Sequence, residues 1–381
     1  MVNLKQTSAT LLRDAALKPI IFETYHGLDS IPWIGLGEFP TPIQKLEKLG
    51  EVEGFKNLYV KRDDKSSPIY GGNKVRKLEW VLADAKATGR KTLIAVGGSG
   101  SNQVLATTIY GRNMGFRVVG FVFDQPNAEY VRRNLLLDHH YGTELHYAPN
   151  LPVELLMFGL TYAWEGLRGE KPYYVPGGAS SPIGNMGYVN AAFEIRNQVE
   201  QGEMPEPDYV LAAAGSLGTA SGLQLGFKLA GMQTRVAAVR VSMPWYITTS
   251  KFASMIGNIN TFMRKADPSV PEVKPRSEEL IMLEDYLGKC YAAFTPECVS
   301  TIKKAKELEG LILDPTYTSK TLLGGLDWLK KRGEKDKVIL FMDTYNSVDL
   351  TPQIEGADYH TLPRSFYRYF EKPTQEEELA Q

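Results

Sequence analysis

Residues 92–122 read TLIAVGGSGSNQVLATTIYGRNMGFRVVGFV, and the pattern of this stretch decides the fold class. Two apolar runs, Thr92–Val96 and Arg117–Val122, flank a longer segment, Asn102–Met114, which follows a glycine-rich turn. Continuously apolar runs of this length are typical of strands that are buried on both faces of a parallel sheet. The stretch therefore predicts a strand, a helix and a second parallel strand, which together form the βαβ unit of α/β proteins.

The same alternation continues on both sides of this unit. Further strands are expected at Leu58–Lys61, Glu144–Tyr147, Tyr173–Val175, Tyr209–Ala213, Val236–Val241 and Val338–Met342. Further helices are expected at Lys77–Thr88, Ala128–His139, Ile183–Gln201, Ala220–Leu229, Pro296–Leu308 and Ser319–Lys331. Eight strands are many for one open sheet of average size, so we expect two α/β layers.

Two regions lack this alternation. The segment Met243–Lys274 is irregular and includes two prolines within Asp267–Pro271, which predicts a connector or an inserted flap. The end of the chain after Phe370 is rich in glutamate, and this composition predicts a solvated end.

The bulk composition excludes several classes of protein. Among 381 residues, 43 lysines and arginines stand against 44 aspartates and glutamates, so we expect neither nucleic acid nor a membrane as partner. No segment approaches the ~18 consecutive apolar residues of a membrane span, and the N-terminus lacks the apolar core of a signal peptide. Cys290 and Cys298 are too few for a disulfide framework and lack the second ligand pair of a zinc site. We therefore expect a cytoplasmic protein without a bound metal.

A lysine near the start of a helix is the first candidate for chemistry. Gly71 and Gly72 lead into a predicted helix that carries Lys74 close to its first turn. The helix dipole disfavours positive charge at this end and so helps an amine to lose its proton. The alternative is an ordinary solvated lysine on a helix of mixed charge.

Two glycine-rich turns that follow apolar runs are candidate anion sites. Backbone N–H groups in the turn Gly97–Asn102 suit a carboxylate or a phosphate, although a tight turn without a ligand explains this spacing equally well. In the turn Gly215–Gly222, small hydroxyl side chains stand among the glycines, which favours a site for a monophosphate. Neither turn matches the dinucleotide or P-loop fingerprint.

A lysine at a helix start, an anion turn and a separate phosphate loop together indicate a pyridoxal phosphate enzyme. The chain resembles the family of 1-aminocyclopropane-1-carboxylate deaminase and D-cysteine desulfhydrase, within the fold group of the tryptophan synthase β subunit. The segments that carry this resemblance are Lys61–Asp64, Gly71–Glu79, Ser101–Gln103, Asn134–Asp138, Ser180–Ala192, Gly215–Gly222 and Asp314–Lys320. They occur in the family's order between about Gly35 and Phe341.

The resemblance implies a specific domain organisation. We expect two three-layer αβα domains of pyridoxal phosphate fold type II, with the cofactor in the cleft between them. The large domain would comprise residues 1–88 and 182–381, and the small domain residues 89–181. Residues 371–381 would form a flexible tail.

The resemblance also implies which residues hold the cofactor. Lys74 matches the lysine that binds pyridoxal 5′-phosphate as a Schiff base and then moves the substrate proton. The cup around the phosphate corresponds to Gly215, Ser216, Leu217, Gly218 and Thr219. Asn102 lies near the cofactor, and Thr344 matches the hydroxyl that faces the pyridine nitrogen.

For the substrate, the resemblance implies a carboxylate-binding loop and two tyrosines. The loop corresponds to Ser101, Asn102 and Gln103. Tyr317 matches the active-site tyrosine, a catalytic residue, and Tyr291 matches a second one. Ser101 is also expected to take part in catalysis because its loop orients the Cα–H bond.

The chain departs from the family pattern at positions that bear on the substrate. Thr318 replaces a glutamate of the deaminases, which favours the desulfhydrase side, whereas Gln103 is deaminase-like. Asp343-Thr344-Tyr345-Asn346 replaces the family's His-Thr-Gly-Gly. A tyrosine in place of a glycine fills space near the cofactor ring, so Tyr345 is expected to reshape the substrate pocket.

The implied reaction is a β-elimination from a small amino acid through an aminoacrylate, which yields a 2-oxo acid and ammonia. Two alternatives remain within the same chemistry, namely deamination of 1-aminocyclopropane-1-carboxylate and β-replacement. A third alternative is a homologue that binds the cofactor or an amino acid without catalysis. The family resemblance further implies a homodimer.

Overall fold

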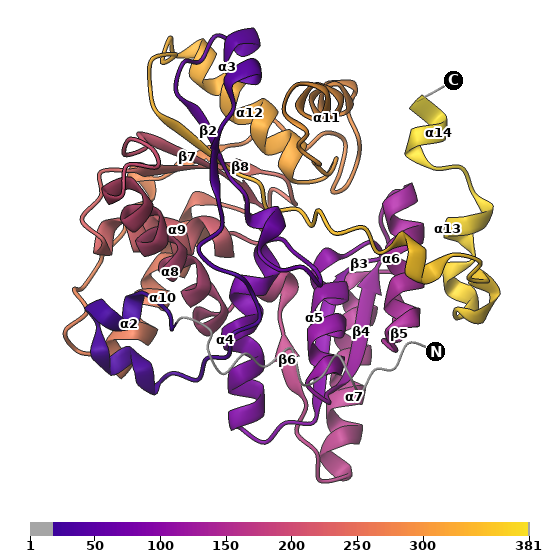
Figure 1. Ribbon diagram of the computed structural model, residues 1–381. Coiled ribbons are helices and arrows are strands. Elements are labelled where there is room, and N and C mark those ends of the chain that lie inside the picture. The colour runs from indigo at the N-terminus through magenta and orange to yellow at the C-terminus, as the bar shows by residue number, and fades with distance from the viewer. Residues whose placement is uncertain (1–17, 380–381) are drawn as a thin grey trace.

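The computed structural model describes residues 18–379, and within them the strands form two sheets (Figure 1). The larger sheet has six strands in the order β1-β2-β10-β7-β8-β9, and the smaller has four in the order β5-β4-β3-β6. Together with the helices that cover both sheets, this arrangement is the α/β fold expected from the sequence. The domain bounds given above stay a prediction.

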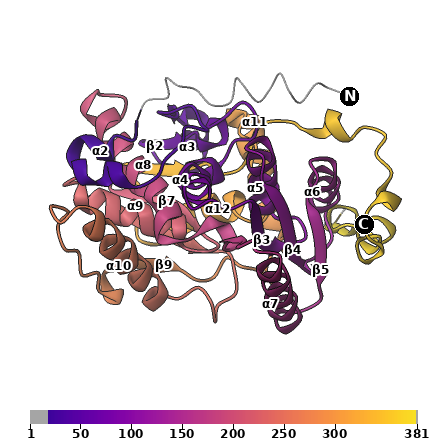
Figure 2. The ribbon, with the colours of Figure 1, turned by 90° about the horizontal axis from the view of Figure 1, so that it is seen from below.

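The smaller sheet is entirely parallel. Its strands are β3 (Thr92–Gly98), β4 (Arg117–Phe123), β5 (Glu144–Ala148) and β6 (Tyr173–Val175). The helices between them are α5 (Asn102–Asn113), α6 (Glu129–His140) and α7 (Leu151–Leu167). Figure 2 shows α5 and α6 on one face of the sheet and α7 on the other. Both faces are therefore covered, which explains why its strands are continuously apolar.

The larger sheet is parallel except for the pair β1 (Ile43–Lys45) and β2 (Leu58–Lys61). The other strands are β7 (Tyr209–Ala214), β8 (Arg235–Arg240), β9 (Ile281–Leu283) and β10 (Ile339–Met342). Figure 1 shows α8, α9 and α10 below this sheet and α3, α11 and α12 above it. Their bounds, with that of α4, are α3 Glu47–Glu53, α4 Asn73–Ala87, α8 Pro182–Glu200, α9 Gly218–Leu229, α10 Thr249–Ala266, α11 Pro296–Glu309 and α12 Thr318–Lys331.

Alternate side chains of the central strand β7 enter different cores. Val210 and Ala212 belong to the cluster below the sheet, whereas Tyr209 and Leu211 belong to the cluster above it. Successive side chains of a strand point to opposite faces, so both faces of this strand must be apolar. The α/β prediction from continuously apolar runs rests on this geometry.

All eight expected strands and all seven expected helices are present, with ends that differ by at most four residues. The expectation for Met243–Lys274 was wrong, because most of this segment forms the regular helix α10. Four apolar side chains of α10 are buried at helical spacing, namely Phe252, Ile256, Ile259 and Met263. The serine, threonine and asparagine residues between them obscured this pattern in the sequence. The strands β1 and β9 and the helices α3 and α7 were also not expected.

The C-terminal segment is held by a few hydrogen bonds, and most of its side chains after Phe370 are exposed. It contains α13 (Arg368–Glu371) and α14 (Gln375–Leu379), and the segment runs beside α6 (Figure 1). The Gln375 backbone N–H donates to the Asn127 carbonyl, and its side chain bonds with Phe294 and Ala292. Hydrogen bonds thus hold residues 374–378, whereas most side chains of residues 371–379 are exposed, as the glutamate-rich composition indicated. That this end forms a flexible tail stays a prediction. Residues 380 and 381 lie outside the described part.

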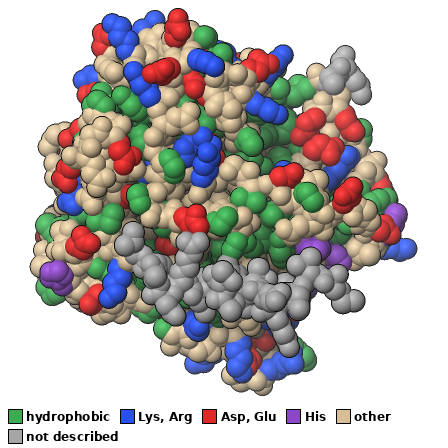
Figure 3. Space-filling view, viewed as in Figure 1, with side chains coloured by type: hydrophobic (Ala, Val, Ile, Leu, Met, Phe, Trp, Pro, Cys, Tyr) green, Lys and Arg blue, Asp and Glu red, His purple; other side chains and the backbone are tan. Residues whose placement is uncertain are grey.

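Acidic and basic side chains are interspersed over the face drawn in Figure 3, and acidic ones gather beside the C-terminal end. Both cysteines are free thiols. No helix among residues 18–379 is long and apolar enough to cross a membrane.

A buried network of charges holds the first turn of α4. The Arg76 guanidinium binds Asp63 at 2.8 Å and Glu194 at 2.8 Å, and Lys61 binds Glu194 at 2.6 Å. The four side chains are almost inaccessible to solvent, and their two positive and two negative charges cancel. Burial by itself raises the pKa of Glu194, but Arg76 and Lys61 outweigh it and lower this pKa to about 2. The start of α4 is thus tied to β2 and α8.

Candidate active site

A cavity of about 580 Å³ opens where strands of both sheets end. Its walls include residues at the carboxyl ends of β3, β7 and β10 and at the first turns of α4, α5 and α9. Ligands of open α/β sheets bind at this edge. Most of the site residues expected from the sequence line the cavity: Lys74, Ser101, Asn102, Gln103, Gly215, Ser216, Leu217, Gly218, Thr219, Tyr291, Tyr317, Thr344 and Tyr345.

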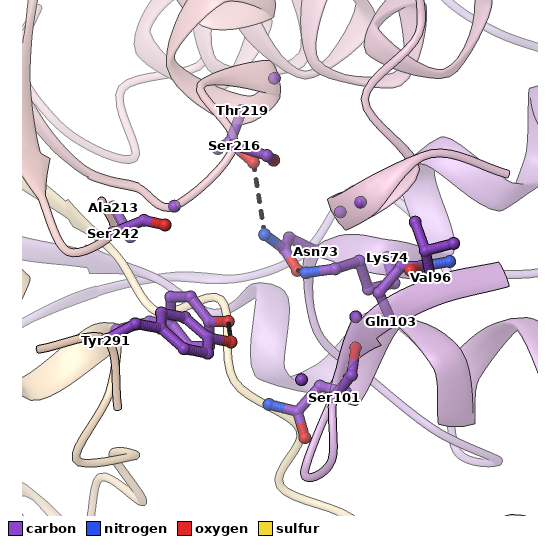
Figure 4. Close-up of a pocket in the computed structure, with 18 of the residues that line it drawn as sticks. Asn73, Lys74, Val96, Ser101, Gln103, Ala213, Ser216, Thr219, Ser242 and Tyr291 are labelled. Carbon is purple, nitrogen blue, oxygen red and sulfur yellow. Dashed lines mark hydrogen bonds between the residues drawn. The ribbon is translucent and has the colours of Figure 1, made fainter. Parts of the chain in front are cut away.

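Lys74 is the second residue of α4, and its side chain points into the cavity (Figure 4). Its Nζ donates to Asn73 Oδ1 at 2.6 Å, and Asn73 Nδ2 donates in turn to Thr219 Oγ1 at 3.3 Å. Burial of the amine among protein atoms lowers the pKa of Lys74 to about 8, although the charge of Asp314 opposes this shift. At neutral pH an appreciable fraction of the amine is therefore uncharged and nucleophilic.

The position of Lys74 depends on a close approach between two chain segments. Gly72 has a φ of 89°, and a Cβ at this position would lie 2.8 Å from the Thr344 carbonyl oxygen. The next residue, Asn73, donates its backbone N–H to the same oxygen at 3.1 Å. Glycine tolerates the positive φ and has no Cβ that would clash with the carbonyl oxygen. The hydrogen bond from Asn73 joins the start of α4 to the end of β10.

The turn before α9 forms a cradle for an anion. Leu217 has a left-handed φ of 69°, an uncommon strain for a leucine, and the N-terminus of α9 follows it. A Cβ at Gly218 would lie within 2.5 Å of Ser180 Oγ, Asn185 Oδ1 and Lys77 Nζ. Backbone N–H groups, a helix N-terminus and an ammonium group therefore meet at one point.

Lys77 was not among the residues expected from the sequence. Its Nζ donates to the Gly178 carbonyl at 3.0 Å and to Ser180 Oγ at 2.9 Å, and it contacts no carboxylate among residues 18–379. Burial and then the neighbouring charge of Lys74 hold the pKa of Lys77 well below its usual range. A buried lysine without a counter-charge fits a site that receives an anion. The spacing of three residues from Lys74, which is one helical turn, could have revealed it.

The Ser101 loop closes the cavity from the side of the smaller sheet. Ser101 Oγ accepts the Val104 N–H at 3.3 Å and so caps α5. Asn102 Oδ1 accepts from Asn134 Nδ2 at 3.0 Å, which fixes the orientation of its amide. Gln103 donates to Thr107, and its buried Oε1 has no partner among the described residues. All three residues of the loop line the cavity.

Two tyrosines line the cavity, and Figure 4 shows Tyr291 across from Lys74. Their hydroxyl oxygens, of Tyr291 and Tyr317, are 2.5 Å apart. Burial raises the pKa of Tyr291 to about 12 and holds that of Tyr317 well above its usual range. Both hydroxyls are therefore protonated at neutral pH, so the pair can donate a proton or relay one.

Thr318 is the one expected site residue that does not line the cavity. It is the first residue of α12, and its hydroxyl donates to Asp314 Oδ1 at 2.7 Å. The cavity wall contains Asp314 instead, whose carboxylate also accepts the backbone N–H groups of Thr316 and Tyr317. The expectation that Thr318 contacts a substrate is thus not met.

Tyr345 spans the two sheets. It follows β10, and its hydroxyl accepts a hydrogen bond from Arg133 of α6 at 2.7 Å. Asn346 Oδ1 accepts the Gly71 N–H at 2.7 Å, next to the turn that leads into α4. The two residues that replace glycines of the family pattern therefore form part of the cavity wall and its support.

Comparisons with known proteins agree with this geometry. The family model described as pyridoxal-phosphate dependent enzyme matches residues 34–344. A protein of Pyrococcus horikoshii named "Putative 1-aminocyclopropane-1-carboxylate deaminase" is 35% identical over 319 residues, which cover 83% of this chain and 92% of the relative. A D-cysteine desulfhydrase of Klebsiella pneumoniae is 31% identical over 324 residues, covering 83% and 94%. A crystal structure of an ACC deaminase homologue superposes with a TM-score of 0.74 at 32% identity, covering 86% and 95%.

Proposed function

This chain belongs to the family of pyridoxal-phosphate dependent enzymes, and from this premise we propose that it removes a β substituent from a small amino acid. It is a lyase or deaminase that uses pyridoxal 5′-phosphate and acts on an amino acid. In the proposed reaction, the amino acid and one water yield the protonated leaving group, a 2-oxo acid and ammonia. One observation carries the proposal. A single cavity contains a lysine with a lowered pKa, a cradle for an anion and a pair of protonated tyrosines.

The residues of the cavity fit the cofactor. Lys74 has the lowered pKa that covalent attachment to an aldehyde requires. The turn Gly215–Thr219, with the amine of Lys77 beside Gly218, offers a cradle to a phosphate, whose charge would favour the protonated amine. Thr344 also lines the cavity, and its hydroxyl would serve as the partner of the pyridine nitrogen. When bound, the cofactor supplies an electron sink for the pair of electrons left at Cα.

The remaining chemistry belongs to the side chains of this chain. Lys74 Nζ would take the proton from Cα, because its pKa lies close to neutral pH. The Tyr291–Tyr317 pair would donate a proton to the departing group from the opposite wall. The Ser101–Gln103 loop would bind the substrate carboxylate through hydroxyl, amide and N–H groups.

The rate at which cofactor-free protein captures pyridoxal phosphate should rise with pH and level off above about pH 8. The folded pKa of Lys74 is lowered from 10.5 to about 8, so the neutral amine predominates above that value. The measurement is the rate of covalent capture between pH 6 and 10, followed by absorbance. Free Nα-acetyl-lysine is the control, and its rate should keep rising towards pH 10. A protein profile that also rises to pH 10 would contradict the burial of this amine.

Replacing Lys77 by methionine should weaken the binding of pyridoxal phosphate by about 30-fold. Hydrogen bonds to charged groups contribute about 1.5–3 kcal/mol, and about 1.4 kcal/mol corresponds to a factor of ten. Pyridoxal, which lacks the phosphate, should bind the variant and the parent equally well. Absorbance titration of cofactor-free protein measures both constants. The exposed Lys86 of the same helix is the matched control, and an equal loss for pyridoxal would exclude a contact with the phosphate.

The test of the proposed function is a product analysis with both enantiomers of cysteine and of β-chloroalanine. Pyruvate and ammonia, with sulfide or chloride, are the expected products. The second candidate is the deaminase reaction, which the 35% identical relative favours, and 1-aminocyclopropane-1-carboxylate would then yield 2-oxobutanoate. Added thiol that appears in a new amino acid would indicate β-replacement. Bound cofactor without turnover of any of these compounds would identify a binding protein instead.

We also propose that the protein is a cytoplasmic homodimer. Two free thiols support a reducing compartment. Four side chains of α7 support an interface because they are apolar, exposed and at helical spacing: Leu156, Leu160, Trp164 and Leu167. Light scattering of the purified protein measures the oligomeric state, and a monomer at micromolar concentration would reject the dimer.

A further inference from the structure

The cavity extends beyond the residues that the proposed function uses. Its outer part, which we call the outer chamber, is lined by Glu154, Tyr174, Trp245 and Tyr246. These side chains come from α7, from β6 and from the loop between β8 and α10. None of them belongs to the anion cradle, the Ser101 loop or the tyrosine pair. Binding of the cofactor and a small substrate therefore gives these four residues no role.

Glu154 is the unusual residue of the outer chamber. It is only 8% exposed, and no hydrogen bond or ion pair to its carboxylate exists among residues 18–379. Its oxygens are not among the fully enclosed side-chain atoms, so the carboxylate faces the cavity, and partial burial without a partner still costs it free energy. Burial accordingly raises its pKa. The other two carboxylates of the cavity have partners, since Asp124 binds Arg368 and Asp314 accepts backbone N–H groups.

Three aromatic residues, Tyr174, Trp245 and Tyr246, line the same cavity as Glu154. Tyr174 lies close enough to Glu154 and Tyr246 that burial and then these two groups raise its pKa. The rings of Trp245 and Tyr246 are 5.7 Å apart, and Trp245 is 71% exposed at the mouth. Lys251 already contacts the ring of Tyr246, at 2.8 Å from its centroid. Aromatic faces beside a carboxylate bind cations through their quadrupoles, and the tryptophan face is the strongest.

We propose that the outer chamber binds the β substituent of the substrate and selects an extended substituent that ends in a cationic group. This inference rests on the proposed function and names its substrate class. S-(2-aminoethyl)cysteine represents this class, since its thioether chain would pass the rings and its ammonium would reach Glu154. An anionic substituent of the same length would meet the unpaired Glu154 carboxylate, while Lys251, the cation beside the chamber, lies against the Tyr246 ring.

The reaction of such a substrate balances without a further reactant. The Cβ–S bond breaks, its electron pair leaves with sulfur, and the sulfur takes up one proton. S-(2-aminoethyl)cysteine and one water then yield 2-aminoethanethiol, pyruvate and ammonia. No oxidant or reductant is needed.

The test compares S-(2-aminoethyl)cysteine with S-carboxymethylcysteine, each as both enantiomers, on the holoenzyme. We expect kcat/KM to favour the aminoethyl compound by at least about tenfold, the size of one ion pair of about 1.4 kcal/mol. Glu154→Gln should abolish this preference and leave β-chloroalanine, which has no extended substituent, unaffected. Trp245→Ala, at an exposed position, should lower kcat/KM for both extended compounds but not for β-chloroalanine. Glu170→Gln changes an acid that pairs with Lys91 outside the cavity and is the matched control.

A binding measurement separates this inference from the proposed function. Lysine and 2-aminoadipate have the shapes of the two test compounds but carry no β leaving group. Calorimetry should show tighter binding of lysine to the parent and equal binding to Glu154→Gln. If β-chloroalanine is turned over but neither kcat/KM nor calorimetry shows a preference for the cationic compound, the outer-chamber inference is overturned and the proposed function is not. Preferential lysine binding without any turnover overturns the proposed function and supports the chamber.

Discussion

Replacing Lys74 by alanine is expected to abolish covalent attachment of the cofactor and to reduce turnover by at least about 10³-fold. The variant loses both the amine that binds the aldehyde and the group that would move the Cα proton, and general acid–base catalysis alone contributes about 10²–10⁴-fold. The measurements are the visible absorbance of the purified protein, peptide mapping after borohydride reduction, and kcat/KM for β-chloroalanine. Only the peptide that contains Lys74 should carry the reduced cofactor in the parent.

Lys86→Ala is the matched control for this experiment. It removes a lysine from the exposed end of the same helix, so it should retain both the absorbance and the activity. External methylamine should restore part of the activity of the Lys74 variant, because it replaces the missing base. Full activity of Lys74→Ala, or reduced cofactor on another lysine, would contradict the assignment of this residue.

Arg76→Met should lower the free energy of unfolding by about 3–5 kcal/mol at pH 7. The substitution leaves Asp63 and Glu194 buried with only Lys61 to balance them, and an uncompensated buried charge costs about this much. The urea concentration at the midpoint of unfolding measures the effect. Because Arg76 follows Lys74 by two residues on α4, cofactor binding should weaken as well.

Two further variants identify the cause of that loss. Lys91→Met breaks an exposed ion pair with Glu170 and should leave the midpoint unchanged. The double variant Arg76→Met, Glu194→Gln removes one charge of each sign and should recover part of the lost stability. If Arg76→Met shifts the midpoint no more than Lys91→Met does, the buried network does not stabilise the fold.

The pattern of the sequence predicted the fold class because the relevant signal is local. Strands such as β3 and β7 are buried on both faces, so they read as continuously apolar runs. The helix α10 was missed because serine, threonine, glycine and asparagine residues stand among its four buried apolar side chains, and this mixture resembles a loop in composition. The strand β9 has only three residues, too few to show a period.

For the candidate site, too, local signals in the sequence indicated some residues and failed for others. Lys74, the Ser101 loop and the turn Gly215–Thr219 line one cavity, and the sequence could single them out because each stands where a glycine turn leads into a helix. Thr318, next to Tyr317 in the sequence, was expected in the cavity. As the first residue of α12, however, it directs its side chain to Asp314 and not into the cavity. Sequence position alone does not state in which direction a side chain points.

The sequence by itself therefore determined the α/β class, the order of the elements and the loops that could hold a phosphate and a reactive lysine. These features depend on residues that are near each other along the chain. Only the tertiary structure decided which side chains have partners: Arg76 with Glu194, Lys77 without a counter-charge, and Glu154 without a partner on the cavity wall. Whether a buried charge is balanced depends on residues more than a hundred positions away, and packing of the two sheets brings these together.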